Sequence, residues 1–207
     1  MTILRQQDPF FLNPSLTRII PGTDRNCNGL SLPQIPLMLS DQLKIVVFGA
    51  FGAGKTTLIR TLDPASTHIE APCAGGTTTI ALDYGHVDMG GRHVYLFGTP
   101  GQERFEFARD IIGRGMDGAI LLIDATCPFD EFVSHLYESL KSSKVPFVVF
   151  LNKCDQVGAS QDPLKQNISS ANVIRASAKN YRESYNAIAD FVITLPPGRH
   201  GNGHPGL

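Results

Sequence analysis

The sequence predicts an α/β fold with a mainly parallel, six-stranded sheet and helices on both faces. Two observations support this prediction. Short apolar runs rich in β-branched residues alternate with segments of helical pattern, an order typical of parallel strands joined by crossover helices. In addition, glycine-rich and polar motifs directly follow several of these runs, and ligands in such sheets bind beyond the carboxyl ends of the strands.

The individual elements follow from the local patterns. Buried strands are predicted where the apolar runs are continuous, at 43–49, 93–98, 118–124, 145–151 and 172–177. The segment 79–87 alternates in polarity and is predicted to be an edge strand. Helical patterns fill the intervals at about 54–62, 103–113, 129–142, 161–169 and 180–195. These elements define one predicted domain over residues 43–195.

The segments that flank this domain lack regular patterns. Residues 1–42 are predicted to be an irregular arm because prolines recur through them, at Pro9, Pro14, Pro21, Pro33 and Pro36. Either the apolar residues of this arm dock on the predicted domain, or the arm is disordered. The sequence leaves both possibilities open. Residues 196–207 have little to bury and are predicted to be a flexible tail.

Composition excludes several classes of function. The formal net charge of the 207 residues is −1, and no Lys/Arg run occurs, so we expect neither nucleic-acid binding nor a direct membrane anchor. The four cysteines are widely spaced and suggest neither a zinc site nor a disulfide framework. No apolar run approaches the ~20 residues of a membrane span. The expected location is cytoplasmic.

The first loop after a predicted strand carries a phosphate-binding motif. Its sequence GAFGAGKTT, Gly49 to Thr57, matches the pattern G-x-x-x-x-G-K-[ST] at the start of a predicted helix. Glycines allow backbone N–H groups to surround phosphate, Lys55 can neutralise the outer phosphates, and the Thr56 hydroxyl can bind Mg²⁺. This P-loop alone fits an ATPase or a small-molecule kinase equally well.

Two later motifs predict selection of the base. NKCD, Asn152 to Asp155, follows a predicted strand, and the Asp155 carboxylate can accept both N–H donors on the pairing edge of guanine. Asn152 and Lys153 are expected to brace this loop and cover the ring. SAK, Ser177 to Lys179, ends the next strand, where the Ala178 N–H can meet the guanine carbonyl.

With these motifs in order, the segment 43–195 resembles the Ras superfamily of small GTPases. The resemblance implies a P-loop G domain, the cofactors GTP/GDP and Mg²⁺, and two switch segments. TIALDYG (79–85) resembles the start of switch I, so Thr79 takes the role of the metal-binding threonine beside Thr56. FGTPGQERF (97–105) resembles switch II, in which Gly101 contacts the terminal phosphate and Gln102 orients the attacking water.

The predicted site is therefore assembled from four loops. Gln102 and Lys55 are the predicted catalytic residues. The predicted nucleotide-binding residues are Gly49, Gly52, Ala53, Gly54, Lys55, Thr56, Thr57, Thr79, Gly101, Asn152, Lys153, Asp155, Ser177, Ala178 and Lys179.

One position departs from the family pattern. Gly98 stands where small GTPases have an aspartate that holds Mg²⁺ through water, so weakened Mg²⁺ binding is expected, and Gly98→Asp is expected to strengthen it. The sequence GTTTIALDYG…LFGTPGQ is similar to the corresponding segments of prokaryotic MglA-like and conservon-type (Rup-like) GTPases, which also lack this aspartate. Asp124 either compensates at the metal or merely ends a strand facing the P-loop; the second is favoured.

Further features predict slow hydrolysis. Phe51 replaces a small P-loop residue and can crowd Gln102, and the presumed switch I loop, 63–79, contains no arginine. Arg104 and Arg109 are expected on the surface, facing a partner. His68 and Glu70 are expected to be solvent-exposed without a chemical role.

The predicted function is that of a GTP-dependent molecular switch with slow GTPase activity, which signals to regulatory or effector proteins through its two switch segments. An activating protein, by resemblance of the roadblock type, is a candidate partner. Two alternatives stay open: a pseudo-GTPase scaffold that binds GTP with little hydrolysis, and a P-loop phosphotransferase or ATPase.

Overall fold

The computed structural model describes residues 41–72, 79–159, 168 and 173–198. The N-terminal arm up to residue 40, all but one residue of the helix predicted at 161–169, and the tail from residue 199 lie outside the described residues. Expectations for these segments therefore stay predictions.

The described strands form a seven-stranded sheet with the order β2-β3-β4-β1-β5-β6-β7. Their bounds are β1 Gln42–Phe48, β2 Thr67–Pro72, β3 Thr79–Met89, β4 Arg92–Gly98, β5 Gly118–Asp124, β6 Phe147–Asn152 and β7 Val173–Arg175. Strands β4, β1, β5, β6 and β7 pair in parallel, whereas β2–β3 and β3–β4 are antiparallel. The sheet is mainly parallel, as predicted.

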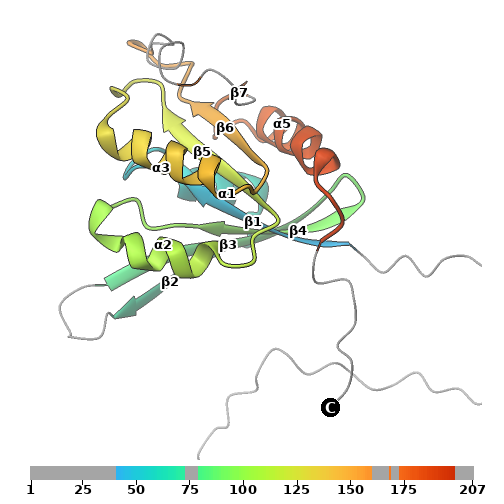
Figure 1. Cartoon of the computed structure of the whole chain (residues 1–207). Helices are drawn as coiled ribbons and strands as arrows, with labels where there is room; N and C mark the ends of the chain where they lie inside the picture. The colour runs from blue at the N-terminus through green and yellow to red at the C-terminus, as the bar shows by residue number, and fades with distance from the viewer. Residues whose placement is uncertain (1–40, 73–78, 160–167, 169–172, 199–207) are drawn as a thin grey trace, which may run out of the picture. The chain divides into compact units, whose positions relative to one another are not determined.

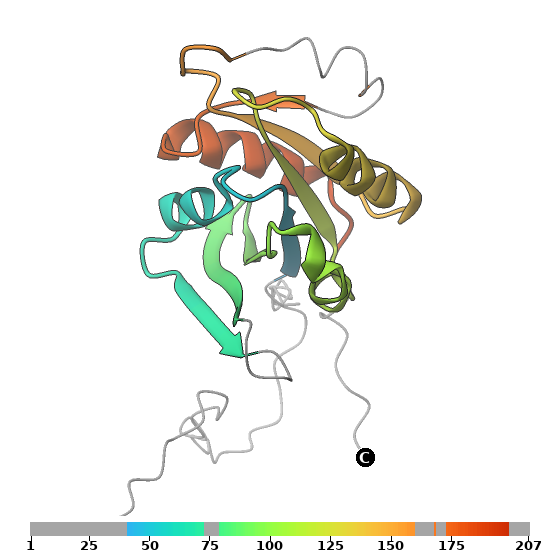
Figure 2. The same cartoon turned by 90° about the vertical axis from the view of Figure 1, so that its left-hand side faces the viewer.

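Two details of the predicted sheet are wrong. The sheet has seven strands instead of six, and β3 is an inner strand, because β2 pairs along its outer side from Thr67↔Tyr84 to Pro72↔Thr79. Residues 67–72 fall in the segment that the sequence analysis treated as a loop. Their own pattern is weak, and the antiparallel partner β3 supplies the backbone hydrogen bonds that make them a strand. Figure 2 shows β2 and β7 at opposite ends of the sheet.

The described helices are α1 Lys55–Leu62, α2 Glu106–Gly113, α3 Glu131–Ser142 and α5 Tyr181–Thr194, with a 3₁₀ turn η1 at Glu103–Phe105. Asp130 caps α3 by accepting a hydrogen bond from the Val133 N–H at 2.8 Å, and the Asn180 side chain caps α5 in the same way. Within the described residues, none of the helices combines the length and apolarity that crossing a bilayer requires.

Helices cover both faces of the sheet (Figure 1). One apolar core lies between the sheet and helices α1 and α5, and contains Leu58, Ile188 and Phe150. A second core lies on the opposite face beneath α3 and contains Leu136 and Leu151. Strands β1 and β5 contribute alternate residues to both cores, which explains their continuous apolar sequences.

The parallel strands place their carboxyl ends at one edge of the sheet. The loops that leave β1, β4, β6 and β7 at this edge carry the glycine-rich loop, the GTPGQ segment, NKCD and SAK. Because β3 runs antiparallel to β4, its residue Asp83 pairs with Gly98 at the carboxyl end of β4. The sheet therefore brings Asp83 to the same edge.

Candidate functional site

The loop between β1 and α1 has the backbone of a phosphate cradle. Gly49, Gly52 and Gly54 have φ angles of 148°, 77° and 107°, values that side chains disfavour. A Cβ atom at Gly49 would also collide with the carbonyl oxygen of Leu122, and one at Gly54 with the side-chain amide of Asn152. The loop thus requires glycine at these positions, and it opens at the N-terminus of α1, where backbone N–H groups attract anions.

Lys55 is the charged group of this cradle. Its side chain is buried, and the ammonium donates to the carbonyl oxygens of Gly49 at 2.9 Å and Ala50 at 2.8 Å. Burial lowers the pKa of Lys55 to about 8, while the negative charge of Asp83 acts in the opposite direction. A desolvated ammonium at the N-terminus of a helix is suited to an anionic ligand such as phosphate.

Asp83 places a carboxylate beside Thr56, opposite Gly98. The Thr56 hydroxyl donates to Asp83 Oδ2 at 2.5 Å. Gly98 lies directly opposite Asp83, and a Cβ atom placed on Gly98 would be 3.1 Å from the Asp83 Cβ. The carboxylate beside Thr56 is thus provided by β3, from the position opposite Gly98.

The donor set of this pocket fits Mg²⁺. The pocket is lined by Phe51, Gly52, Gly54, Lys55, Thr56, Thr57, His68, Asp83, Thr99, Pro100 and Gly101. Mg²⁺ prefers oxygen ligands and is commonly held by one or two protein groups together with phosphate and water. The Thr56 hydroxyl and the Asp83 carboxylate are such groups. Thr79, the other predicted ligand, begins β3, and its side chain lies outside the described residues.

Asp83 and His68 are in contact at the phosphate pocket, and neither had been predicted to contribute to the site. His68 is exposed, as expected, and its Nδ1 lies 2.6 Å from Asp83 Oδ1 at the lining of the phosphate pocket. A signal for Asp83 was present, because aspartate is disfavoured inside a strand, and here it interrupts an otherwise β-forming run. Glu70 is part of β2, and its side chain lies outside the described residues.

The GTPGQ segment closes against the glycine-rich loop. A Cβ atom on Gly101 would lie 2.6 Å from both the Lys55 ammonium and the Phe51 backbone nitrogen, so only glycine fits this approach. Gln102 follows at the start of η1 and is exposed, and its side-chain oxygen accepts a hydrogen bond from Arg104 at 2.8 Å. The Phe51 ring is 79% exposed.

Arg109 was expected to face solvent or a partner, and this expectation is wrong. Its side chain is 4% exposed. The guanidinium donates to the carbonyl oxygens of Gln102 at 2.6 Å and Glu103 at 3.0 Å, and lies 5.0 Å from the centre of the Phe132 ring. A single buried cation therefore holds the backbone that follows Gly101, whereas Arg104 is exposed, as expected.

We expect Arg109→Ala to lower the free energy of unfolding by about 2–3 kcal/mol, because it removes charge-assisted hydrogen bonds to carbonyl groups. Urea denaturation measures this effect, and hydrogen exchange of residues 101–105 should accelerate more than exchange in β5. Arg104→Ala is the matched control and should change stability by less than about 0.5 kcal/mol. Equal effects of the two substitutions would contradict the assigned role of Arg109.

Asn152 connects two loops of the site. Its side-chain nitrogen donates to the Ala53 carbonyl at 2.8 Å, and its side-chain oxygen accepts from the Ala178 N–H at 2.8 Å. The predicted bracing role of Asn152 agrees with this geometry. The Ala178 N–H, which was predicted to meet guanine, is bonded to Asn152 in this structure.

Lys153 makes a second connection to the glycine-rich loop. Its ammonium donates to the Gly52 carbonyl at 3.0 Å and forms an ion pair with Asp124. Hydrogen bonds from Lys153 and Thr126 lower the pKa of Asp124 against the opposing effect of burial. Asp124, the last residue of β5, thus pairs with Lys153 of the NKCD loop.

A second pocket lies beside these braces. It is lined by Cys154, Asp155, Arg175, Ala176, Ser177, Lys179, Asn180 and Glu183. Asp155 is exposed. The Ser177 N–H donates to the Glu183 carboxylate at 3.2 Å, and this hydrogen bond connects the SAK loop to the start of α5. The predicted base-selecting residues are thus brought together next to the phosphate cradle.

Comparison with known proteins agrees with this arrangement. The sequence pattern of the family described as "Elongation factor Tu GTP binding domain" matches residues 73–194, a range that includes the GTPGQ, NKCD and SAK motifs. An uncharacterized protein of Methanocaldococcus jannaschii is 36% identical over 118 residues, which cover 57% of this chain and 74% of the relative. Translation initiation factor IF-2 of Pelotomaculum thermopropionicum is 33% identical over 138 residues, but the match spans only 14% of that factor.

Solved structures show the same fold. Translation elongation factor SelB of Methanococcus maripaludis, in complex with the GTP analogue GppNHp, superposes with a TM-score of 0.59 at 18% identity, covering 76% of this chain and 35% of SelB. The G domain of the T. maritima FeoB iron transporter gives a TM-score of 0.56 at 20% identity, covering 73% of this chain and 99% of that domain. With the family match over more than half of its length, the chain belongs to the family of elongation factor Tu GTP-binding domains.

Proposed function

We propose that this chain is a GTP-dependent molecular switch that binds GTP and GDP with Mg²⁺, hydrolyses GTP slowly and passes its nucleotide state to a protein partner. The observation that carries the proposal is the placement of Asp83 beside Thr56, which keeps a metal-binding carboxylate in the phosphate pocket despite Gly98. The similarity of GTTTIALDYG and GTPGQ to prokaryotic MglA-like GTPases supports the small-GTPase type.

The phosphate, metal and base positions of the predicted site then have proposed tasks. The glycine-rich loop and Lys55 bind the phosphates, and Asp155 selects guanine by accepting its two N–H donors. Thr56, Thr79 and Asp83 hold Mg²⁺, which when bound neutralises charge on the phosphates. Gly101 lies against Lys55 and the P-loop, a position from which its N–H can contact a terminal phosphate. These groups order the two switch segments when GTP is bound.

Slow hydrolysis follows from the state of Gln102. Its side chain is exposed and its oxygen is engaged by Arg104, so it must turn before it can orient a water molecule toward the phosphate. An activating protein that binds the exposed Phe107 and Ile111 on α2 would contact the same helix that follows Gln102. We therefore infer that regulators, which include the roadblock type by resemblance, act at α2.

The direct test is phosphate release from purified protein. We expect guanine-selective binding with ATP failing to compete, and a low rate of hydrolysis that Gln102→Ala lowers by at least about 10-fold, because a group that acts in the transition state is lost. Glu103→Gln, at the neighbouring exposed position, is the control and should leave the rate unchanged.

The test also separates the alternatives. Tight GTP binding without any phosphate release, in single-turnover assays as well as in steady state, would favour a pseudo-GTPase scaffold. Equal competition by ATP would return the chain to the class of P-loop phosphotransferases or ATPases, because it would remove the role of Asp155.

A further inference from the structure

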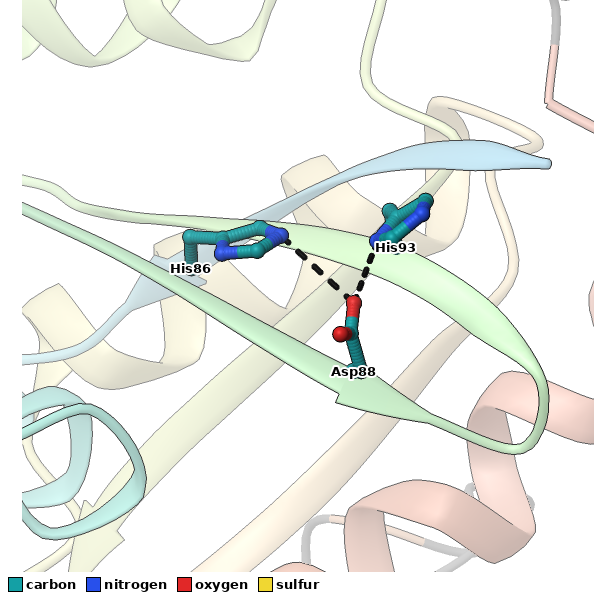
Figure 3. A group of neighbouring side chains, drawn as sticks. All are labelled: His86, Asp88 and His93. Carbon is teal, nitrogen blue, oxygen red and sulfur yellow. Dashed lines mark hydrogen bonds and ion pairs between the residues drawn. The ribbon is translucent and has the colours of Figure 1, made fainter. Parts of the chain in front are cut away.

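Three potential metal ligands converge on the β3–β4 hairpin, outside the nucleotide site. They are His86 and Asp88 on β3 and His93 on β4 (Figure 3). One ligand atom from each lies within 4.8 Å of the others, and His86 Nε2 is 3.6 Å from Asp88 Oδ1. His93 Nδ1 contacts the same carboxylate oxygen. The imidazoles of His86 and His93 thus each direct a nitrogen at Asp88 Oδ1.

The hairpin fixes the backbone positions of these residues. Gly90 and Gly91 form its two-residue turn, with φ angles of 60° and 75°, which is the backbone of a turn that matches the twist of the strands. Arg92 therefore pairs with Met89, and His93 pairs with Asp88. His86 is two residues before Asp88 and so points to the same face of the sheet.

Neighbouring groups restrict the side chains and their backbone. The rings of His86 and His93 stack with their centres 5.7 Å apart, and the His86 ring lies 5.2 Å from that of Tyr95. The Tyr185 hydroxyl of α5 donates to the Asp88 carbonyl at 3.1 Å, and the His93 N–H donates to the Asp41 carbonyl at 2.9 Å. The backbone of Asp88 and His93 and the ring of His86 are therefore held in place by neighbouring groups.

We propose that His86, Asp88 and His93 form a binding site for a divalent transition-metal ion of the Zn²⁺ type. In a tetrahedral Zn²⁺ site with bonds of about 2.0–2.1 Å, neighbouring ligand atoms lie roughly 3.3 Å apart. The His86–Asp88 separation of 3.6 Å is close to this value, whereas the shorter His93–Asp88 contact must lengthen to admit the ion. Imidazole nitrogen selects Zn²⁺, Cu²⁺ or Ni²⁺ over Mg²⁺, so the site is chemically distinct from the phosphate pocket.

The hairpin site leaves room for a further ligand. His86 and Asp88 are exposed, so solvent reaches the metal position and water completes the coordination. The bound ion would connect β3 with β4. It would take the place of the contacts that both imidazoles make with the Asp88 carboxylate. Binding should consequently stabilise the folded chain, since the ligands are brought together only by the hairpin.

The test is Zn²⁺ titration of the full, tag-free chain loaded with GDP in excess Mg²⁺, with a chromophoric chelator as competitor. We expect one equivalent to bind and to raise the melting temperature. His86→Gln and His93→Gln should each weaken binding at least about 10-fold, the lower end of what loss of even an indirect metal partner costs. Unchanged GDP affinity and an unchanged metal-free melting temperature will show that both variants fold.

Three controls locate the bound ion. His135→Gln removes an exposed histidine of α3, the double variant His200→Gln/His204→Gln removes the histidines of the C-terminal segment, and His68→Gln removes the histidine beside Asp83. All three should bind Zn²⁺ as tightly as the original chain. Absence of Zn²⁺ binding, undiminished binding by both His86→Gln and His93→Gln, or loss of binding in any control would each overturn the proposal.

Discussion

Asp155→Asn is expected to lower affinity for GDP by a factor on the order of 10³, the largest effect of any single substitution considered for this chain. Asp155 lies exposed in the second pocket, next to Ser177 and Lys179. A carboxylate accepts both N–H donors of guanine, whereas an amide turns one of its own donors toward them. Sites built on such hydrogen bonds reject a mismatched partner by several powers of ten.

The same substitution should improve binding of xanthosine diphosphate. Xanthine replaces one donor of guanine with a carbonyl oxygen, and the asparagine amide offers a donor and an acceptor in the matching order. Competition titrations with a fluorescent nucleotide measure both affinities. Gln156→Ala, the exposed neighbour in the same loop, should change neither. A parallel loss for both nucleotides would mean that Asp155 supports the loop and does not read the base.

Asp83→Gly is expected to weaken Mg²⁺ binding to the nucleotide complex by roughly 10–100-fold, as measured by GDP dissociation over a range of Mg²⁺ concentrations. The substitution removes the carboxylate that accepts from Thr56. Asp88→Asn, a loss of charge on the same strand, serves as the control and should leave Mg²⁺ dependence unchanged.

Placing an aspartate at position 98 of β4 should strengthen Mg²⁺ binding only when Asp83 has been replaced by glycine. A Cβ atom on Gly98 would lie 3.0 Å from Ile59 Cδ1 and 3.3 Å from Asp83 Oδ2, so Gly98→Asp alone crowds the pocket and places two carboxylates together. On this geometry we expect Gly98→Asp alone to leave Mg²⁺ binding no stronger, in contrast to the expectation from the sequence. Asp83→Gly/Gly98→Asp should recover most of the affinity that Asp83→Gly loses. Additive losses in the double variant would show that the two positions do not share one task.

The sequence predicts a residue's position best where that position is determined by the residue's own loop and the strand before it. The P-loop glycines, NKCD and SAK follow strands as predicted, because their motifs are local. For the P-loop and NKCD, the long apolar runs of β1 and β6 add a second signal. Strand β2 was missed because its stability comes from pairing with β3. Local pattern carries little information about such a partner.

The contacts between distant segments could not be predicted in the same way. Arg109 is buried because the carbonyl oxygens of Gln102 and Glu103 turn toward its guanidinium. The helical pattern of 103–113 does not specify this arrangement. The role of Asp83 depends on the register of an antiparallel pair, and a shift by one residue would turn its side chain to the other face of the sheet. Both residues act through tertiary geometry.

The two hydrogen bonds of Asn152 have a consequence for nucleotide exchange. One amide group belongs at once to the loop under the phosphates and to the loop around the base, so neither loop can withdraw without straining the other. In the proposed switch, displacing one of the two loops is therefore expected to loosen the protein's hold on both ends of the nucleotide. Release of GDP from this chain should consequently be concerted, with the base and the phosphates leaving in a single kinetic step.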